Sequence, residues 1–162
     1  MADDYAKAIK DADARRAAQR AVRAAQEERQ TACVQFFKSI EMGLAAEMEK
    51  ANPALERGQF AERFSGPHAA EPPDCRMMLG FGGTSNKREI VLDMQDQTKP
   101  TVCVLEPEKG GTVALQYLLE DKGAGLRAYS TEGSGVADWR TDFTPAAVAR
   151  RIVESVIDGL CR

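Results

Sequence analysis

The one histidine of the chain, His68, has acidic and thiol side chains close by in the sequence. Glu71, Asp74 and Cys75 follow it, and zinc accepts histidine, carboxylate and thiolate ligands. Their spacing matches no established ligand pattern, and the proline-rich stretch around them is typical of a solvated loop. A pair of His68 with Cys75 or Cys103 would suit nucleophilic catalysis, but cysteine at a strand position is more often a small buried hydrophobe. We therefore predict no metal, no cofactor and no catalytic residue.

A glycine-rich stretch, residues 80–87, has the composition of a phosphate-binding loop, because glycine lets backbone N–H groups approach an anion. A Walker loop or a dinucleotide fingerprint opens a helix, whereas residues 88–94 have the alternation of a strand. The stretch therefore predicts a hairpin connection. Carboxylates also occur near predicted strand ends, but their spacing brings no two of them onto a shared proton.

Aromatic and charged side chains gather in the last two predicted strands. They are Tyr129, Asp138, Trp139 and Arg140. In a suitable register these side chains would line a ligand-binding mouth. The other interpretation, which we favour, is that the single tryptophan closes the edge of a hydrophobic core.

Two sets of residues near the N-terminus have helical spacing that would suit contact with a partner. One set is basic and suits phosphates or an acidic protein: Arg16, Arg20 and Arg23. For the arginines, a solvated charged face is the alternative interpretation, and the one that we favour. The other set is small, spaced by four and three, and would let a second helix approach closely, as in a short coiled coil: Ala14, Ala18, Ala21 and Ala25.

Nucleic acid is the least favoured partner of this region. Residues 1–32 hold seven basic and six acidic side chains, and the whole chain has a net charge of −3. No aromatic side chains lie beside the arginines to stack on bases.

The segment that carries both sets, residues 3–30, predicts a long helix with too little apolar surface to be buried. Alanine and straight-chain charged residues favour helix, and Ile9 and Val22 are its only larger aliphatic side chains. From about Glu28 onward the helix gains one apolar stripe, at spacings of three and four: Cys33, Phe36, Phe37, Ile40, Leu44 and Met48. We expect the first part to project and the second part to meet a core.

Asn52 and Pro53 predict the start of a second, short helix over residues 53–64. Asparagine is a good N-cap, and proline is favoured at the first helical position. The prolines between Ser65 and Asp74 predict a loop after it.

From Cys75 onward the hydrophobic period changes to two, which predicts strands. The strand candidates are Cys75–Phe81, Glu89–Met94, Thr101–Leu105, Thr112–Leu119, Leu126–Thr131 and Val136–Thr141. Their connections are too short for crossover helices, so neighbours should pair antiparallel as a meander of five or six strands.

Thr144 and Pro145 predict the start of a C-terminal helix. Its apolar face would be Ala149, Ile152, Val153, Val156, Ile157 and Leu160. The predicted fold class is therefore α+β, with the helices on one face of the antiparallel sheet. Residues 1–30 would form a projecting extension, and residues 31–162 a single α+β domain.

The composition indicates a cytoplasmic protein. Its four cysteines contain no Cys-x-x-Cys pair, Met1 is followed by charged residues, and no apolar run approaches the roughly 20 residues that span a bilayer. The richness in alanine and arginine indicates a bacterial source.

We expect a non-enzymatic protein that acts by protein interaction or self-association through the first helix. The alternative is a small-molecule binding protein or an enzyme whose pocket lies between sheet and helices. A recognisable set of acid, base or nucleophile would favour the enzyme, and the sequence offers none.

Overall fold

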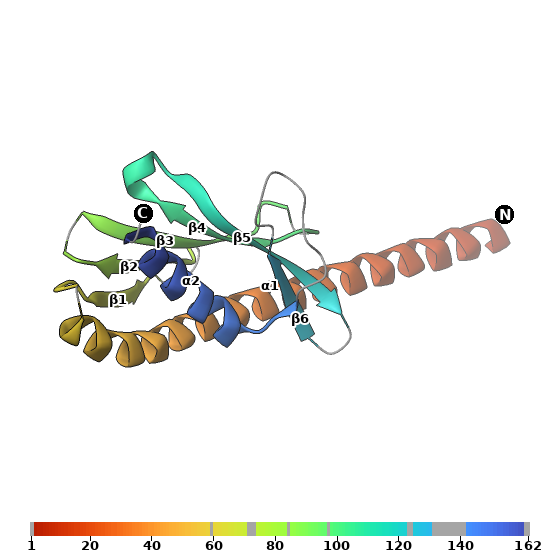
Figure 1. The fold of residues 1–162 in the computed structure, drawn as a ribbon. Coiled ribbons are helices and arrows are strands. Elements are labelled where there is room, and N and C mark those ends of the chain that lie inside the picture. Colours follow the sequence, from red (N-terminus) through yellow and green to blue (C-terminus); the bar gives the residue numbers. More distant parts are fainter. Residues whose placement is uncertain are drawn as a thin grey trace.

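The computed structural model describes residues 2–58, 60–70, 74–83, 85–96, 98–122, 125–130 and 142–160. Within them the chain forms two α-helices, α1 (Ala2–Arg57) and α2 (Pro145–Leu160). The strands are β1 (Phe64–Ala69), β2 (Arg76–Phe81), β3 (Asn86–Asp93), β4 (Thr101–Glu106), β5 (Thr112–Lys122), β6 (Gly125–Ser130) and β7 (Asp142–Phe143). A short 3-10 helix, η1 (Pro107–Lys109), follows β4. Figure 1 shows the N-terminal part of α1 extending well beyond the sheet.

The strands form one antiparallel sheet in which each strand pairs with the next along the chain, from β1 to β7. This confirms the predicted α+β class and the meander. The predicted number of five or six strands is wrong, because the described residues hold seven. The additional strands are β1 and β7, while the predicted strand over residues 136–141 lies outside the described residues.

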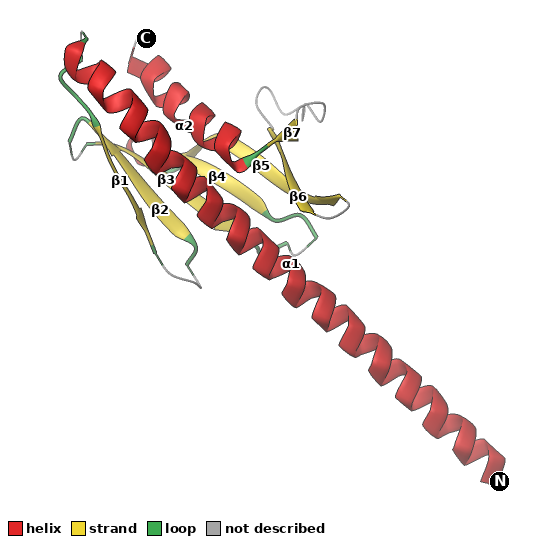
Figure 2. Ribbon diagram, turned by 90° about the horizontal axis from the view of Figure 1, so that it is seen from below, coloured by secondary structure: helices red, strands yellow, loops and turns green. Residues whose placement is uncertain are grey.

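Both helices lie against the same face of the sheet, as Figure 2 shows. The register places Met77, Ile90, Val104 and Leu115 side by side across four strands, and all four side chains are buried. They belong to one hydrophobic cluster with the buried faces of the two helices. The core therefore lies between the sheet and the helices.

The predicted apolar stripe of α1 is buried as expected. Every member is at most 7% exposed: Cys33, Phe36, Phe37, Ile40, Leu44 and Met48. The predicted start of α2 is also confirmed, because the Thr144 hydroxyl accepts a hydrogen bond from the Ala147 N–H at 3.2 Å. On α2, Ile152, Val153 and Val156 are buried.

The predicted second helix over residues 53–64 is wrong. α1 continues through Pro53 to Arg57, and Asn52 caps no helix. The Asn52 side chain instead pairs with the first residue of β1: Oδ1 accepts from the Phe64 N–H at 2.8 Å, and Nδ2 donates to the Phe64 carbonyl at 3.1 Å. This two-way bond ties the end of α1 to the edge of the sheet.

The predicted loop over residues 65–74 is also wrong in its first half, where β1 pairs with β2. Proline is accepted in β1 because this is an edge strand, so the missing N–H of Pro67 leaves no inner ladder incomplete. The register shifts between Ser65 and His68, around the cis Gly66–Pro67 bond. Pro67 therefore lies in an irregular edge strand, while residues 71–73 lie outside the described residues.

The two helices approach each other closely at Gly43. A Cβ atom added to Gly43 would lie 2.9 Å from the Ala149 Cβ, closer than real side chains come. Glycine on α1 and alanine on α2 thus allow a close crossing that larger residues would prevent.

Candidate functional site

The first half of α1 forms the longest exposed element of the described structure. Residues 4–28, hereafter the projecting segment, are helical and exposed without interruption. α1 has 56 residues, so its length is about 84 Å at the usual rise per residue. Three of the large hydrophobic side chains that the structure leaves exposed lie here, Tyr5, Ile9 and Val22, each more than half exposed. The segment is therefore surface along its entire circumference.

The projecting segment ends where Arg29 meets the sheet. One guanidinium nitrogen of Arg29, Nη2, donates to the carbonyls of Thr98 and Leu119, both at 3.3 Å. One turn later Cys33 is 1% exposed. Arg29 thus anchors the helix to the sheet at the point from which it projects.

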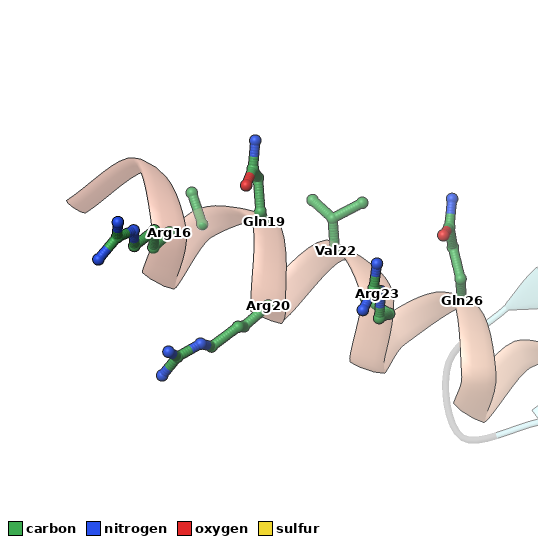
Figure 3. Close-up of a pocket in the computed structure, with 7 residues that line it drawn as sticks. Arg16, Gln19, Arg20, Val22, Arg23 and Gln26 are labelled. Carbon is green, nitrogen blue, oxygen red and sulfur yellow. The ribbon is translucent and has the colours of Figure 1, made fainter. Parts of the chain in front are cut away.

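Figure 3 shows how side chains are arranged along the projecting segment. Gln19, Val22 and Gln26 point to one side of the helix, and Arg16 and Arg20 point elsewhere. Together with Ala18 and Arg23 they form one stretch of open helix surface. All of these residues come from one helix, so no second element forms an opposite wall. This surface suits an extended partner, since a small molecule requires a concave site.

The predicted basic set is exposed, and its charges are partly compensated. Arg16, Arg20 and Arg23 lie in the projecting segment. A guanidinium nitrogen of Arg16 lies 4.0 Å from a carboxylate oxygen of Asp13, and both side chains are mostly exposed. Such a pair contributes little to stability but lowers the local positive charge.

The predicted small residues, hereafter the alanine line, are Ala14, Ala18, Ala21 and Ala25, and all four are exposed. Gly43 follows Ala25 by 18 residues, about five turns of an α-helix, so both lie on the same side of α1. On that side α2 packs closely against Gly43. The alanine line is therefore the exposed continuation of a side of α1 that already receives a helix within the domain.

The structure does not bring the predicted ligand-binding set together. Tyr129 lies in β6 and is 3% exposed. Its neighbour Ala128 belongs to the core, so Tyr129 lies on the opposite face of the sheet from the helices. Asp138, Trp139 and Arg140 lie outside the described residues.

The centre of the space between sheet and helices, where the ligand alternative requires a pocket, is filled with side chains. Ile90, Val104, Leu119 and Ile152 are completely buried there. At the edge of this space, between α1 and β1, a hollow of about 230 Å³ remains, lined by Val34, Phe37, Lys38, Glu41, Ala69, Ala70 and Cys75. Sequence reasoning missed a polar cleft of about 530 Å³ beside α2, lined by Glu106, Lys109, Arg151, Glu154, Ser155, Asp158 and Gly159. The polar face of α2, with Glu154 and Asp158 one turn apart, is the signal that would have indicated it.

Ion pairs connect the charges in and around this cleft. Glu106 lies 3.5 Å from Arg88 and 2.7 Å from Lys109, measured between carboxylate oxygens and side-chain nitrogens. Glu154 lies 2.8 Å from the Nε of Arg150, and this bond raises the pKa of Arg150. Glu106, Lys109 and Glu154 of the cleft are therefore already paired with opposite charges.

The thiols have the character of structural cysteines. Burial raises the pKa of the Cys33 thiol and of the Cys103 thiol, which disfavours the reactive thiolate. Cys75 is buried and His68 is exposed. Within the described part of the chain, no three metal-ligating side chains come together.

The glycine-rich stretch of residues 80–87 contains a hairpin connection, as predicted. Phe81 pairs with Asn86 across it, and Gly82 adopts a φ of 64°, which favours glycine. β3 follows directly, so no helix N-terminus faces this connection.

Comparison of the chain with family models, with curated proteins and with solved structures finds no match in any of the three. Neither described helix has an apolar stretch long enough to cross a lipid bilayer.

Proposed function

We propose that the protein acts by binding another protein molecule, a second copy or a different partner, through the projecting segment, and that it does so without catalysis. The observation that carries this proposal is the uninterrupted exposure of residues 4–28 in a continuous helix.

The energetics of helices support a contact there. Most of the stability of helices in proteins comes from packing an apolar face against other elements, more than from helix propensity. The projecting segment has only its intrinsic helix propensity and its continuity with the buried part of α1. A partner that packs along it would supply the missing tertiary contact.

The anchoring of α1 supports the same function. Arg29 and the buried apolar stripe fix the direction in which the helix leaves the domain. A surface that is ordered before binding loses less conformational entropy when it binds. The projecting segment is thus presented to a partner in a defined orientation.

Deletion of residues 2–26 tests the proposal. The shortened chain keeps Arg29 and the apolar stripe, so we expect the domain to unfold at the same temperature as the domain of the full chain. Association should be lost, measured as molar mass by light scattering and as proteins captured from a lysate on the immobilised chain. An unchanged mass together with an unchanged set of captured proteins would contradict the proposal.

The alternative function, binding of a small molecule, has its support in the polar cleft beside α2. A ligand would have to exchange with the ion pairs that Glu106 and Glu154 make. A thermal-shift screen with charged metabolites on the full chain and on Asp158→Asn tests it. Stabilisation of the parent chain that the variant loses would favour this alternative.

A further inference from the structure

We propose that the occupant of the projecting segment is a second copy of this chain, whose own projecting segment packs antiparallel along the alanine line. This inference deepens the proposed function and rests on it. The arguments are the closeness of approach, the position of α2 and the complementarity of charge.

The alanine line permits a close approach. Helix axes come to about 8 Å only where the facing side chains are small. In the domain, α1 accepts α2 on the same side, through Gly43 and Ala149. The four exposed alanines repeat this condition over about three turns. A second helix therefore fits against the projecting segment in the same way as α2 fits against the buried part of α1.

The position of α2 sets the direction of the second helix. A parallel helix in register would continue along the same side of α1 from Ala25 to Gly43. There α2 leaves no room even for an added methyl group on Gly43. An antiparallel helix brings its own domain to the opposite end of the pair. The antiparallel arrangement therefore avoids α2, and the parallel one requires the helices to separate.

One antiparallel register brings all four alanines into contact. When Ala18 lies opposite Ala21 of the second copy, the two-fold symmetry places Ala14 opposite Ala25, and each contact occurs twice. The register is centred on the alanine line, and the residues that take part in the contact, from Lys10 to Glu28, lie within the projecting segment.

The charges beside the alanine line complement each other in this register. Lys10 and Glu28 are 18 residues apart and thus lie on the same flank of the line. In an antiparallel pair with two-fold symmetry, each flank of one helix lies beside the same flank of the other helix. Lys10 of one copy therefore faces Glu28 of the other. This ion pair, formed twice by the symmetry, therefore flanks the contact, while Arg29 keeps its guanidinium on the carbonyls of Thr98 and Leu119.

Sedimentation of the full chain over a range of concentrations tests self-association. We expect a monomer–dimer equilibrium, and a weak one, because alanine buries little apolar area. Ala18→Glu with Ala21→Glu should weaken the dimer at least about tenfold by placing charge in the contact. Ala8→Glu with Ala12→Glu is the matched control, since it adds the same charge at exposed alanines turned away from the line. It should leave the dimer constant within about twofold.

Charge reversal tests the direction of the pair. At low salt, Lys10→Glu or Glu28→Lys alone should weaken the dimer about three- to tenfold, because each loses two surface ion pairs. The variant with both changes should recover the dimer dissociation constant of the parent chain, since the ion pair between positions 10 and 28 is restored with its charges exchanged. In a parallel dimer Lys10 would face Asp11 of the other copy instead of Glu28, so the variant with both changes would not recover the parent dissociation constant.

Each remaining outcome overturns the inference in a distinct way. A full chain that is monomeric at every concentration would refute self-pairing. The proposed function would then still stand if capture of a different partner depended on residues 2–26. The alanine line is not the contact if Ala18→Glu with Ala21→Glu leaves the dimer constant unchanged. The same conclusion follows if the control variant weakens the dimer equally. If the variant with both changes dimerises no better than the single variants, the antiparallel direction is refuted.

Discussion

The two halves of α1 belong to one continuous helix but are held in different ways. From Cys33 to Leu55 a stripe of larger apolar side chains is buried in the core, while residues 4–28 are exposed on every side. The backbone conformation is the same on both sides of Arg29. The comparison therefore separates what helix propensity does from what tertiary packing does.

In the buried half, the helical period places large side chains on one side, and the sheet covers them. In the projecting half, alanines and long charged side chains supply propensity without an apolar stripe. The first half thus contributes little to the stability of the domain, and the second half contributes much. Substitutions at similar side chains in the two halves should separate these contributions.

The largest difference is expected between Ile40 and Val22. Ile40 is completely buried, so Ile40→Ala should lower the free energy of unfolding by about 2–5 kcal/mol through lost burial and a cavity. Val22 is 59% exposed, and Val22→Ala should change it by less than about 0.5 kcal/mol. Chemical denaturation of both variants measures the difference. Equal costs at the two positions would mean that the projecting segment is packed in solution.

A smaller effect is expected at the end of the buried half, where Asn52 holds Phe64. Asn52→Ala removes both hydrogen bonds to the Phe64 backbone and should cost about 1–3 kcal/mol. Asn52→Asp keeps the acceptor and should cost less. Denaturation gives the cost, and amide exchange should show β1 opening first. Unchanged exchange in β1 would show that the side chain does not hold this strand.

The smallest effect is expected at Gly43, where two contributions oppose each other. Gly43→Ala places a methyl group against Ala149 and overpacks the crossing, at a cost of about 1–3 kcal/mol. Replacing glycine within a helix offsets about 1 kcal/mol of this. We expect net destabilisation in thermal unfolding, relieved when Ala149→Gly is added. Stabilisation by Gly43→Ala alone would show that the helices separate easily.

Local periodicity was sufficient to predict most of the fold. The stripe on α1, the strands from β2 to β6 and the face of α2 repeat with the period of their element, and the structure contains each of them. The alanine line was predicted in the same way, because its spacing depends on one helix alone.

The features that the sequence did not predict depend on contacts between distant residues. β1 becomes a strand because it pairs with β2 and because Asn52 binds Phe64, and neither partner is visible in the local pattern around Pro67. The carbonyls that hold Arg29 lie 69 and 90 residues away. The polar cleft combines residues from α2 with Glu106 at the end of β4 and Lys109 of η1, so only the folded chain brings them together.

The anchor at Arg29 has a mechanical consequence. Because the helix is rooted in the core and continuous, the distance from Asp4 to Arg29, about 38 Å along the axis, acts as a strut of fixed length. A molecule that grips the far end would therefore transmit force and rotation to the sheet instead of merely tethering it. A partner bound at that end would therefore be held at a fixed distance and angle from the sheet.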